Sequence, residues 1–286
     1  MRIVVDCAYL AYRSFHKMSG LSYDEKRVGV IFGFMLQILK LADEFKTNKF
    51  IFCWDSRHSY RKLIYPEYKA HRRVDMTEEE TADLEDAYAQ FDELRERFLP
   101  YLGFKNIFHQ GGYEADDLIA YIVYRIPDDT MIVSADNDLF QLLKNDRFCP
   151  VRMWNFKVIN TEEEFSKSWF GLKPIDWPNV KAISGCTSDN VVGVPGVGEI
   201  TAAKYVAKIL LGSKRGLIED SKQLIQFNQR LVGLPFAGKK PIKPINLDED
   251  EISPTKFKAG FGQYGFRSLL TAEAEAKWMK SFFGVK

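Results

Sequence analysis

Two short groups of acidic residues are the clearest candidates for chemistry in this chain. Glu114, Asp116 and Asp117 lie within four consecutive positions, and Asp136 and Asp138 follow a second apolar run. No Lys or Arg lies inside either group, although acids on an ordinary surface usually alternate with bases. If these carboxylates converge in a cleft, they repel one another strongly. Bound divalent cations would relieve that repulsion, and oxygen ligands favour hard ions such as Mg²⁺ or Mn²⁺.

The elements that must position these acids are short strands that alternate with helices. Apolar runs at 2–6, 50–54 and 130–134 predict strands. Helical spacing of apolar residues predicts one helix over 28–45 and another from 118 onward. This alternation predicts an α/β fold with a central, mostly parallel sheet flanked by helices.

Most of the acids fall at the expected ends of these strands. Asp6 ends the first strand, Asp55 follows the second, and Asp136 and Asp138 follow the third. Functional groups collect beyond the carboxyl ends of parallel strands, so one sheet edge would gather them. Taken singly, each acid also has an ordinary structural explanation, because Asp at a strand end often caps the next helix. Asp55, Asp116 and Asp117 are the acids to which this alternative applies most directly.

Composition sets broad limits on the class of protein. The chain has 286 residues, of which 46% are hydrophobic and 28% charged, as is usual for a globular protein of one large domain or two. No apolar run approaches the ~20 residues that a membrane span needs. Cys7, Cys53, Cys149 and Cys186 form no CxxC pair, which suits a reducing cytoplasm.

The distribution of charge predicts two functional regions. Residues 1–180 contain 24 Lys and Arg against 29 Asp and Glu, whereas residues 181–286 contain 16 against 10. An acidic region joined to a basic one suits metal chemistry beside a site for a polyanion. We therefore expect a metal-binding core at 1–180 and a polyanion-binding region at 181–286.

Residues 57–98 interrupt the strand–helix alternation. A basic stretch around Tyr68, Lys69 and Arg72 comes first, and a stretch rich in Glu and Asp with one apolar face follows from Glu78. The simplest interpretation is a solvated helical hairpin inserted into the core. A functional interpretation, a basic element that contacts a phosphate, also remains open.

The run from Gly193 to Val206 matches a helix-hairpin-helix. Gly196 and Gly198 are separated by one residue, which allows a tight turn and close approach to a phosphate. Gly198 leads into a helix whose free N–H groups favour an anion, and Lys204 adds a positive charge. Such a hairpin contacts the DNA backbone without selecting a sequence.

Together these motifs resemble the 5′-nuclease superfamily, which includes phage-type flap endonucleases, 5′→3′ exonucleases and the N-terminal nuclease domain of bacterial DNA polymerase I. The resemblance extends from Asp6 to about Phe266 and implies a PIN-like nuclease core with a helical arch at about 57–98 and a C-terminal helix-hairpin-helix region. It implies that eight acids bind two Mg²⁺ or Mn²⁺ ions, directly or through waters: Asp6, Asp55, Glu114, Asp116, Asp117, Asp136, Asp138 and Asp189.

The resemblance also implies roles for basic and aromatic residues. Lys69 and Arg72 would act on the scissile phosphate, and Arg13 and Tyr68 would lie near the DNA. The hairpin residues Gly196, Gly198 and Lys204 would contact the duplex, and hairpin carbonyls would hold K⁺. The implied partner is DNA with a 5′ flap, a nick, a branch or a single-stranded 5′ arm. We expect a monomer, with no membrane association, in the cytoplasm of a bacterial or phage-infected cell.

The chain departs from the family pattern at one position. The family has Gly-Asp-x-x-Asp-Asn before the hairpin, whereas this chain has Gly185-Cys186-Thr187-Ser188-Asp189-Asn190. A neutral thiol is a poor ligand for Mg²⁺, so we expect the second metal site to be weaker than the first. Two alternatives to an active DNA nuclease follow: a catalytically impaired protein that binds DNA structures, and a PIN-type ribonuclease.

Overall fold

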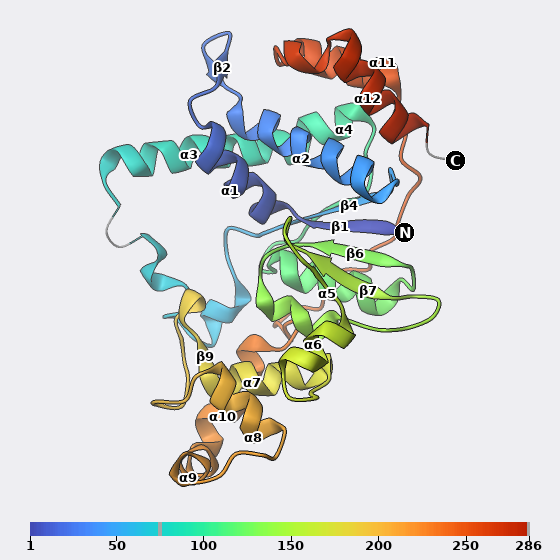
Figure 1. Cartoon of the computed structure of the whole chain (residues 1–286). Coiled ribbons are helices and arrows are strands. Elements are labelled where there is room, and N and C mark those ends of the chain that lie inside the picture. The colour runs from blue at the N-terminus through green and yellow to red at the C-terminus, as the bar shows by residue number, and fades with distance from the viewer. Residues whose placement is uncertain (74–75, 285–286) are drawn as a thin grey trace. The chain divides into compact units, whose positions relative to one another are not determined.

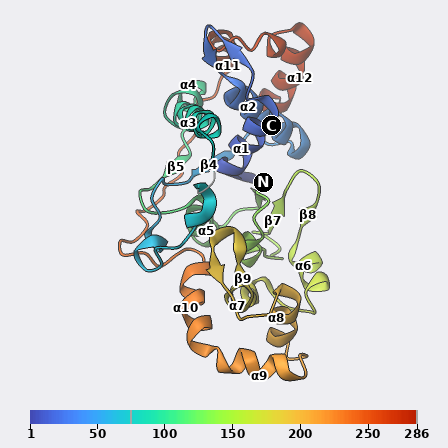
Figure 2. The ribbon, with the colours of Figure 1, turned by 90° about the vertical axis from the view of Figure 1, so that its left-hand side faces the viewer.

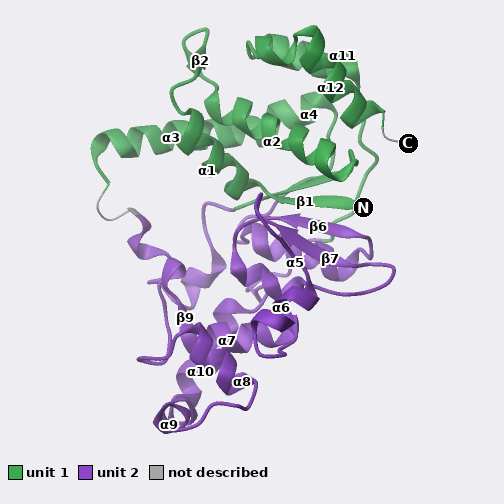
Figure 3. Ribbon diagram, in the orientation of Figure 1, with its two compact units in different colours: residues 1–55, 76–108, 244–286 green, residues 56–75, 109–243 purple. Residues whose placement is uncertain are grey.

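The structure, a computed structural model, describes residues 1–73 and 76–284, which form two compact units (Figure 3). Unit 1 comprises residues 1–55, 76–108 and 244–286, and unit 2 comprises residues 56–75 and 109–243. Val74 and Asp75, which fall in the predicted arch, lie outside the described residues.

Unit 1 contains the first strands and the last helices of the chain (Figure 1). Its elements are β1 (Arg2–Asp6), α1 (Cys7–Met18), β2 (Ser22–Tyr23), β3 (Lys26–Arg27), α2 (Gly29–Phe45), β4 (Phe50–Trp54), α3 (Glu78–Glu93), a π-helical turn (Leu94–Phe98), α4 (Leu99–Leu102), α11 (Pro254–Gln263), a 3₁₀ turn (Arg267–Leu269) and α12 (Ala272–Phe283). Strand β5 (Ile107–His109) crosses the division between the units.

Strands β1 and β4 and helix α2 form as predicted, whereas α1 is a helix that was not predicted. Strands β1 and β4 are parallel, with Ile3 opposite Phe50 and Asp6 opposite Cys53, and both strands are buried almost throughout. Helix α2 packs on α1 at Gly33, where an added Cβ would lie 2.8 Å from the Ser14 Cβ. This close approach of the two helices requires glycine at position 33.

An aromatic cluster joins the last helices to β4 within unit 1. Phe282 of α12 stacks on Phe50 with ring centroids 5.6 Å apart, and Phe104 contacts both Phe52 and Phe257 of α11. Burial of such large rings contributes several kcal/mol in total, because each buries roughly 150–250 Å². The segment 244–286 is consequently part of unit 1. The predicted division at residues 180 and 181 falls inside unit 2 and stays a prediction about function.

Unit 2 contains the remaining strands and the hairpin region. Its elements are 3₁₀ turns at Tyr60–Leu63, Ala70–Arg73, Asn137–Leu142, Pro174–Asp176 and Thr187–Asp189, helices α5 (Ala115–Arg125), α6 (Glu162–Ser168), α7 (Trp177–Ser184), α8 (Glu199–Val206), α9 (Ser213–Asp220) and α10 (Lys222–Val232), and strands β6 (Thr130–Val133), β7 (Val151–Trp154), β8 (Ile159–Asn160), β9 (Gly185–Cys186) and β10 (Val191–Val192).

Within unit 2, β6 and β7 run parallel and β8 is antiparallel to β7. Helix α7 packs against α8 and α10, and the short antiparallel pair of β9 and β10 lies at the C-terminal end of α7 (Figure 2). Gly185 permits this pairing, since it has φ of +77° and an added Cβ would lie 2.4 Å from the Gly193 N. These contacts fix the loop that carries Cys186 and Asp189.

The fold is α/β with a mostly parallel sheet flanked by helices, as predicted. The predicted acidic helix of the arch region is α3, whose N-terminus is capped by Thr77 and Glu80 and whose residues Ala87 and Phe91 are buried. Among the described residues, no helix is both long enough and apolar enough to cross a membrane.

Candidate metal centre

Asp6 and Asp55 lie at the carboxyl ends of the paired strands β1 and β4 in unit 1. Asp6 is 8% exposed, and its carboxylate accepts a hydrogen bond from the Tyr9 N at 3.1 Å, so it caps α1. Asp55 is exposed. Burial raises the pKa of the nearby Cys7 thiol, and the negative charges of Asp6 and Asp55 raise it further. Both acids therefore act on the same point at the end of the sheet.

Arg13 lies two turns into α1, on the same helix that Asp6 caps. It is half-buried and interacts with the Tyr9 hydroxyl. Burial raises the pKa of Tyr9, whereas the positive charge of Arg13 opposes that rise. Arg13 therefore places a positive charge in the neighbourhood of Asp6.

Glu114, Asp116 and Asp117 occupy the start of α5 in unit 2. Glu114 is 7% exposed, Asp116 is half-buried and Asp117 is fully buried. The Asp117 carboxylate accepts hydrogen bonds from the backbone N of Glu114 at 3.1 Å and of Phe236 at 2.8 Å. Asp117 is thus a helix-capping residue, as the structural alternative for this position anticipated.

Arg61 is the partner of this acidic group that sequence reasoning missed. Its side chain is buried and donates two hydrogen bonds to Asp117, at 2.7 and 2.9 Å, and one to the Leu231 carbonyl at 2.8 Å. Its Nη1 lies 3.4 Å from the Glu114 Oε2. Arg61 belongs to a run of basic residues, and nothing in that run distinguishes a buried arginine from exposed ones.

Four of the predicted metal ligands line one small cavity in unit 2. The cavity measures about 10 Å³, room for about one water or ion. Val191, Leu231, Val232 and Leu234 close its apolar side. Its polar lining is Glu114, Asp116, Asp138, Asp189, Arg61 and Tyr68.

Lys69 and Tyr68 join the two sides of this cavity. The Lys69 Nζ lies 2.9 Å from the Glu114 Oε2 and 3.7 Å from the Asp189 Oδ1. The Tyr68 hydroxyl lies 2.9 Å from the same Glu114 oxygen and 3.0 Å from the Asp189 Oδ2. Lys69 has φ of +54°, and its backbone N donates to the Asp189 carbonyl at 2.9 Å. The predicted phosphate-contacting lysine is therefore fixed beside the acids through its backbone.

Charges around Glu114 keep it ionised despite its burial. Burial raises its pKa, but Lys69 and Arg61 together lower the pKa to about 2.

Arg72 lies further out: its Nη2 is 2.9 Å from the Asp189 Oδ1 and its Nε donates to the Ser188 carbonyl at 3.2 Å. The side chain of Arg72 is 51% exposed, so it faces solvent beside the acids.

Asp136 and Asp138 differ in environment although they are two residues apart. Asp136 is exposed and accepts a hydrogen bond from the Asp138 N at 2.8 Å, which caps the turn that follows. The Asp138 side chain is 13% exposed, and burial followed by the charge of Asp136 raises its pKa to about 6. Lys181, which the sequence did not single out, places its Nζ 3.1 Å from the Asp138 Oδ1.

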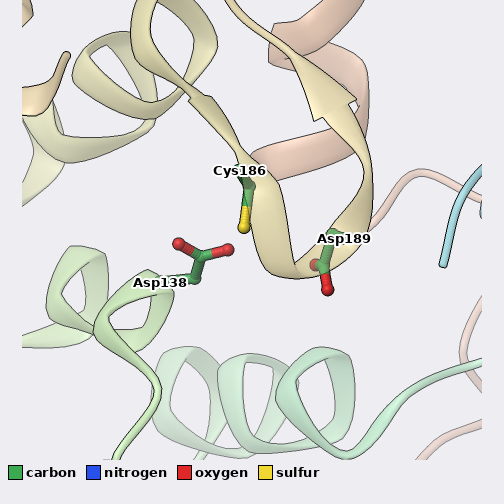
Figure 4. A group of neighbouring side chains, drawn as sticks. All are labelled: Asp138, Cys186 and Asp189. Atoms are coloured by element: carbon green, nitrogen blue, oxygen red, sulfur yellow. The ribbon is translucent and has the colours of Figure 1, made fainter. Parts of the chain in front are cut away.

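Asp138, Cys186 and Asp189 form a group with the geometry of a metal site (Figure 4). One ligand atom from each lies within 4.8 Å of the others. The Asp138 Oδ1 is buried, and its charge is paired with the Lys181 Nζ at 3.1 Å. The two carboxylates fit a divalent cation, whereas the thiol stands where a third hard ligand would be.

The Cys186 thiol is held in its neutral form. It packs in an apolar cluster with Tyr68, Val191 and Leu231, and its Sγ lies 3.1 Å from the Ser188 Oγ. Burial, together with the charges of Asp138 and Asp189, raises its pKa to about 11. The thiol therefore adds no negative charge to the group at neutral pH.

The predicted hairpin residues lie on an open surface. Gly196 has φ of +72°, and an added Cβ at Gly196 or Gly198 would meet nothing within 4 Å. Gly198 is the N-cap of α8, and Lys204 in that helix lies 5.5 Å from the centre of the Phe170 ring. The backbone N–H groups at the start of α8 are thus accessible to an anion.

The chain is similar to several known proteins. A family model described as the 5′-3′ exonuclease, N-terminal resolvase-like domain, matches residues 1–171. The DNA polymerase I of Mycobacterium bovis is 28% identical over 226 residues, covering 76% of this chain and 24% of that protein. The 5′-3′ exonuclease of Bacillus subtilis is 29% identical over 215 residues, covering 71% of this chain and 69% of that protein. The chain spans about a quarter of the length of the DNA polymerases that it matches.

The D15 protein of bacteriophage T5, crystallised with metal ions, has the same fold. Its TM-score is 0.68 at 22% identity, and the match covers 99% of this chain and 98% of that protein. A complex of the same phage protein, a flap endonuclease, with DNA and metal ions gives a TM-score of 0.66 at 21% identity. That match also covers 99% of this chain and 98% of the phage protein.

Proposed function

Because the chain belongs to the 5′-3′ exonuclease family, we propose that it is a structure-specific 5′ nuclease that hydrolyses DNA near 5′ ends or flap junctions. The observation that carries this proposal is the cavity lined by Glu114, Asp116, Asp138 and Asp189. Four carboxyl groups around a space for about one water or ion suit a divalent cation.

The family resemblance assigns Asp6, Asp55, Glu114 and Asp116 to the first ion, which we take to be Mg²⁺ or Mn²⁺; within unit 2, Glu114 and Asp116 line the same cavity. All four ligands are carboxylates, which these ions prefer. When bound, a pair of such ions supplies an activated water and stabilises the negative charge that phosphodiester hydrolysis develops. Glu114 is ready for this role because its depressed pKa keeps it ionised.

The second ion belongs with Asp136, Asp138 and Asp189, directly or through waters. Asp138 and Asp189 supply the closely spaced oxygens, and Asp136 contributes charge from the exposed side.

Asp117 acts on the ions indirectly, through the residues that it positions. Its carboxylate is satisfied by Arg61 and two backbone N–H groups, so it orients Glu114 and the start of α5.

Lys69 and Arg72 are the candidates for contact with the scissile phosphate. The Lys69 ammonium already lies 2.9 Å from Glu114, so it can reach a phosphate held beside that carboxylate. Arg72 is half-exposed next to Asp189, and a guanidinium is a good partner for phosphate oxygens. The Tyr68 hydroxyl orients Glu114 and Asp189 from beneath them.

Contacts with the rest of the DNA involve the hairpin and α1. Gly196 and Gly198 expose backbone to a duplex phosphate, Lys204 adds charge on α8, and hairpin carbonyls can hold K⁺. Arg13 of α1 adds a positive charge in unit 1. The D15 protein of phage T5 was crystallised with DNA, which supports DNA with a 5′ flap, nick or single-stranded 5′ arm as the partner. We propose a monomer that works in the cytoplasm of a bacterial or phage-infected cell.

A substrate panel tests the proposal. The protein is incubated with 5′-flap, nicked and fully single-stranded DNA, and with a matching RNA flap, in Mg²⁺, Mn²⁺, Ca²⁺ or EDTA. We expect cleavage near the flap junction in Mg²⁺ or Mn²⁺ only, lost in Glu114→Gln, with the RNA flap cut far more slowly. Absence of cleavage of every DNA at millimolar Mn²⁺, or a preference for RNA, would contradict it.

Cys186 favours one second candidate, a protein that binds flap DNA but hydrolyses it poorly. The thiol stands in the ligand group with Asp138 and Asp189, where a carboxylate would bind Mg²⁺. This candidate predicts flap binding in Ca²⁺ with negligible turnover. The variant Cys186→Asp distinguishes the two: a large gain in the Mg²⁺-dependent rate identifies a handicapped enzyme, and an unchanged, substantial rate identifies a competent one.

A further inference from the structure

Lys181 is a buried lysine that faces the candidate metal centre rather than solvent. It lies in α7, and its side chain is 8% exposed. Its Nζ is 3.1 Å from the Asp138 Oδ1 and 2.9 Å from the Oε1 of Glu199, the first residue of α8. Lysine is rarely buried unless its charge is paired. Here the pairing carboxylate is one that the proposed function assigns to an ion.

Asp189 has a cation of its own. The Arg72 Nη2 lies 2.9 Å from the Asp189 Oδ1, and the Lys69 Nζ lies 3.7 Å from the same oxygen. Each carboxylate of the group formed by Asp138, Cys186 and Asp189 is therefore in an ion pair with a protein side chain. The third member is a thiol, which adds no formal charge when protonated.

The charges in this group balance without a metal. Asp138, Asp189 and Glu199 contribute three negative charges, and Lys181, Arg72 and Lys69 contribute three positive ones. An aspartate at position 186 would leave one negative charge in excess. Cysteine at 186 removes that excess, so a divalent cation that enters the group meets a neutral site.

Distances make Lys181 a direct competitor for the second ion. Mg²⁺ binds carboxylate oxygens at about 2.0–2.1 Å. An ion on the Asp138 Oδ1 would lie at most about 5 Å from a Lys181 Nζ that is 3.1 Å from the same oxygen. Two like charges at that separation in a buried site repel strongly.

We propose that Lys181 serves as a built-in cation for the second half of the centre, so that this protein binds one divalent ion tightly and a second only weakly. The inference rests on the proposed function, because it concerns the same carboxylates. It also links the hairpin to the centre, since the ammonium is shared between Asp138 and the first residue of α8. An ion that displaces Lys181 from Asp138 would leave it with Glu199.

The test is to count Mn²⁺ ions bound by the DNA-free protein, from the electron paramagnetic resonance signal of free Mn²⁺ at pH 8. The variants are Lys181→Met, Lys181→Gln and Lys181→Arg. The control is Lys167→Met, because Lys167 is an exposed lysine of α6 that pairs with the surface acids Glu163 and Glu164. We expect one tight ion in the unmodified protein. The Met and Gln variants should tighten the second ion by on the order of 10-fold or more, whereas Lys181→Arg and Lys167→Met should not.

Three results would overturn the inference. The first is two ions of similar affinity in the unmodified protein. The second is Mn²⁺ binding by Lys181→Gln that equals that of the unmodified protein while thermal unfolding shows both to be folded. The third is a tight Cd²⁺ site whose thiolate absorption band disappears in Cys186→Ser but not in Cys149→Ser, because a thiolate would then hold the second ion.

Ion counting keeps this inference separate from the proposed function. If the protein cleaves no flap in any metal, the nuclease proposal fails, while the number of Mn²⁺ ions still decides the role of Lys181. If cleavage is normal but two ions bind equally well, the role of Lys181 fails alone.

Discussion

Replacement of Arg61 by methionine should destabilise the protein severely although Arg61 is proposed to touch neither ion nor DNA. The guanidinium is 2% exposed, forms two hydrogen bonds with the fully buried Asp117 and a third with the Leu231 carbonyl. The ring of Phe236 lies 4.8 Å from it. Methionine fills much of the same volume but leaves the Asp117 charge buried without a counter-ion.

The expected cost follows from that unpaired charge. Removal of one partner of a buried ion pair destabilises a protein by about 3–5 kcal/mol. Two backbone N–H groups still donate to Asp117 in the variant, from Glu114 and Phe236. We therefore expect the lower end of the range, about 3 kcal/mol, in the free energy of unfolding.

The assay is urea unfolding followed by circular dichroism at pH 7 in EDTA, with the slope of the transition compared between variants. The control is Arg215→Met, because Arg215 is 56% exposed and pairs with Glu219 on the surface of α9. That exposed pair should contribute little to stability because water and salt screen it. The double variant Arg61→Met, Asp117→Leu should recover part of the lost stability, because it removes both charges. Equal costs for Arg61→Met and Arg215→Met would refute the reasoning.

Three further predictions concern the acids, the lysine and the hairpin. Because the folded-state pKa of Glu114 is depressed to about 2, the Glu114 carboxylate stabilises the metal-free fold above its ordinary pKa of 4.5, and this stabilisation is lost as the pH falls toward 2. The melting temperature of Glu114→Gln should therefore fall less between pH 6 and pH 3 than that of the unmodified protein. An equal fall in both proteins would count against a depressed pKa of Glu114. Lys69→Ala should lower the single-turnover cleavage rate far more than flap affinity in Ca²⁺, and the reverse outcome would remove its catalytic role. Gly196→Ala should lower the free energy of unfolding in urea by about 1–2 kcal/mol, because Gly196 has a positive φ. Gly198→Ala should lower it less, because Gly198 has an ordinary φ. Equal losses for the two variants would contradict backbone strain as the reason for glycine at position 196.

The sequence was sufficient to predict the elements that carry the acids. Apolar periodicity located β1, α2, β4 and β6 to within about a residue, because each is a buried element whose pattern is set by burial alone. The fold class followed from the order of those elements, whereas the family was a resemblance carried by the acidic motifs and the hairpin. Periodicity could not predict that residues 244–286 belong to unit 1, because the contact of Phe282 with Phe50 joins segments far apart in the chain.

The cations around the acids could not be predicted in the same way. Arg61 and Lys181 are ordinary basic residues in the sequence, and only tertiary contacts show that both are buried against carboxylates. Asp117 was predicted to hold or orient an ion, and its bond to Arg61 supports the orienting role. The substitution at Cys186 was visible in the sequence, but the charge balance with Lys181 and Arg72 was not.

Anomalous X-ray diffraction can locate Mn²⁺ in crystals grown with a short 5′-flap DNA, and this measurement tests the assignment of the tight ion to Glu114 and Asp116 most directly. We expect a strong Mn²⁺ peak within bonding distance of Glu114 and Asp116, and at most a weak one at Asp138 and Asp189. A crystal with bound DNA and no Mn²⁺ near Glu114, or with Mn²⁺ only at Asp138 and Asp189, would contradict it.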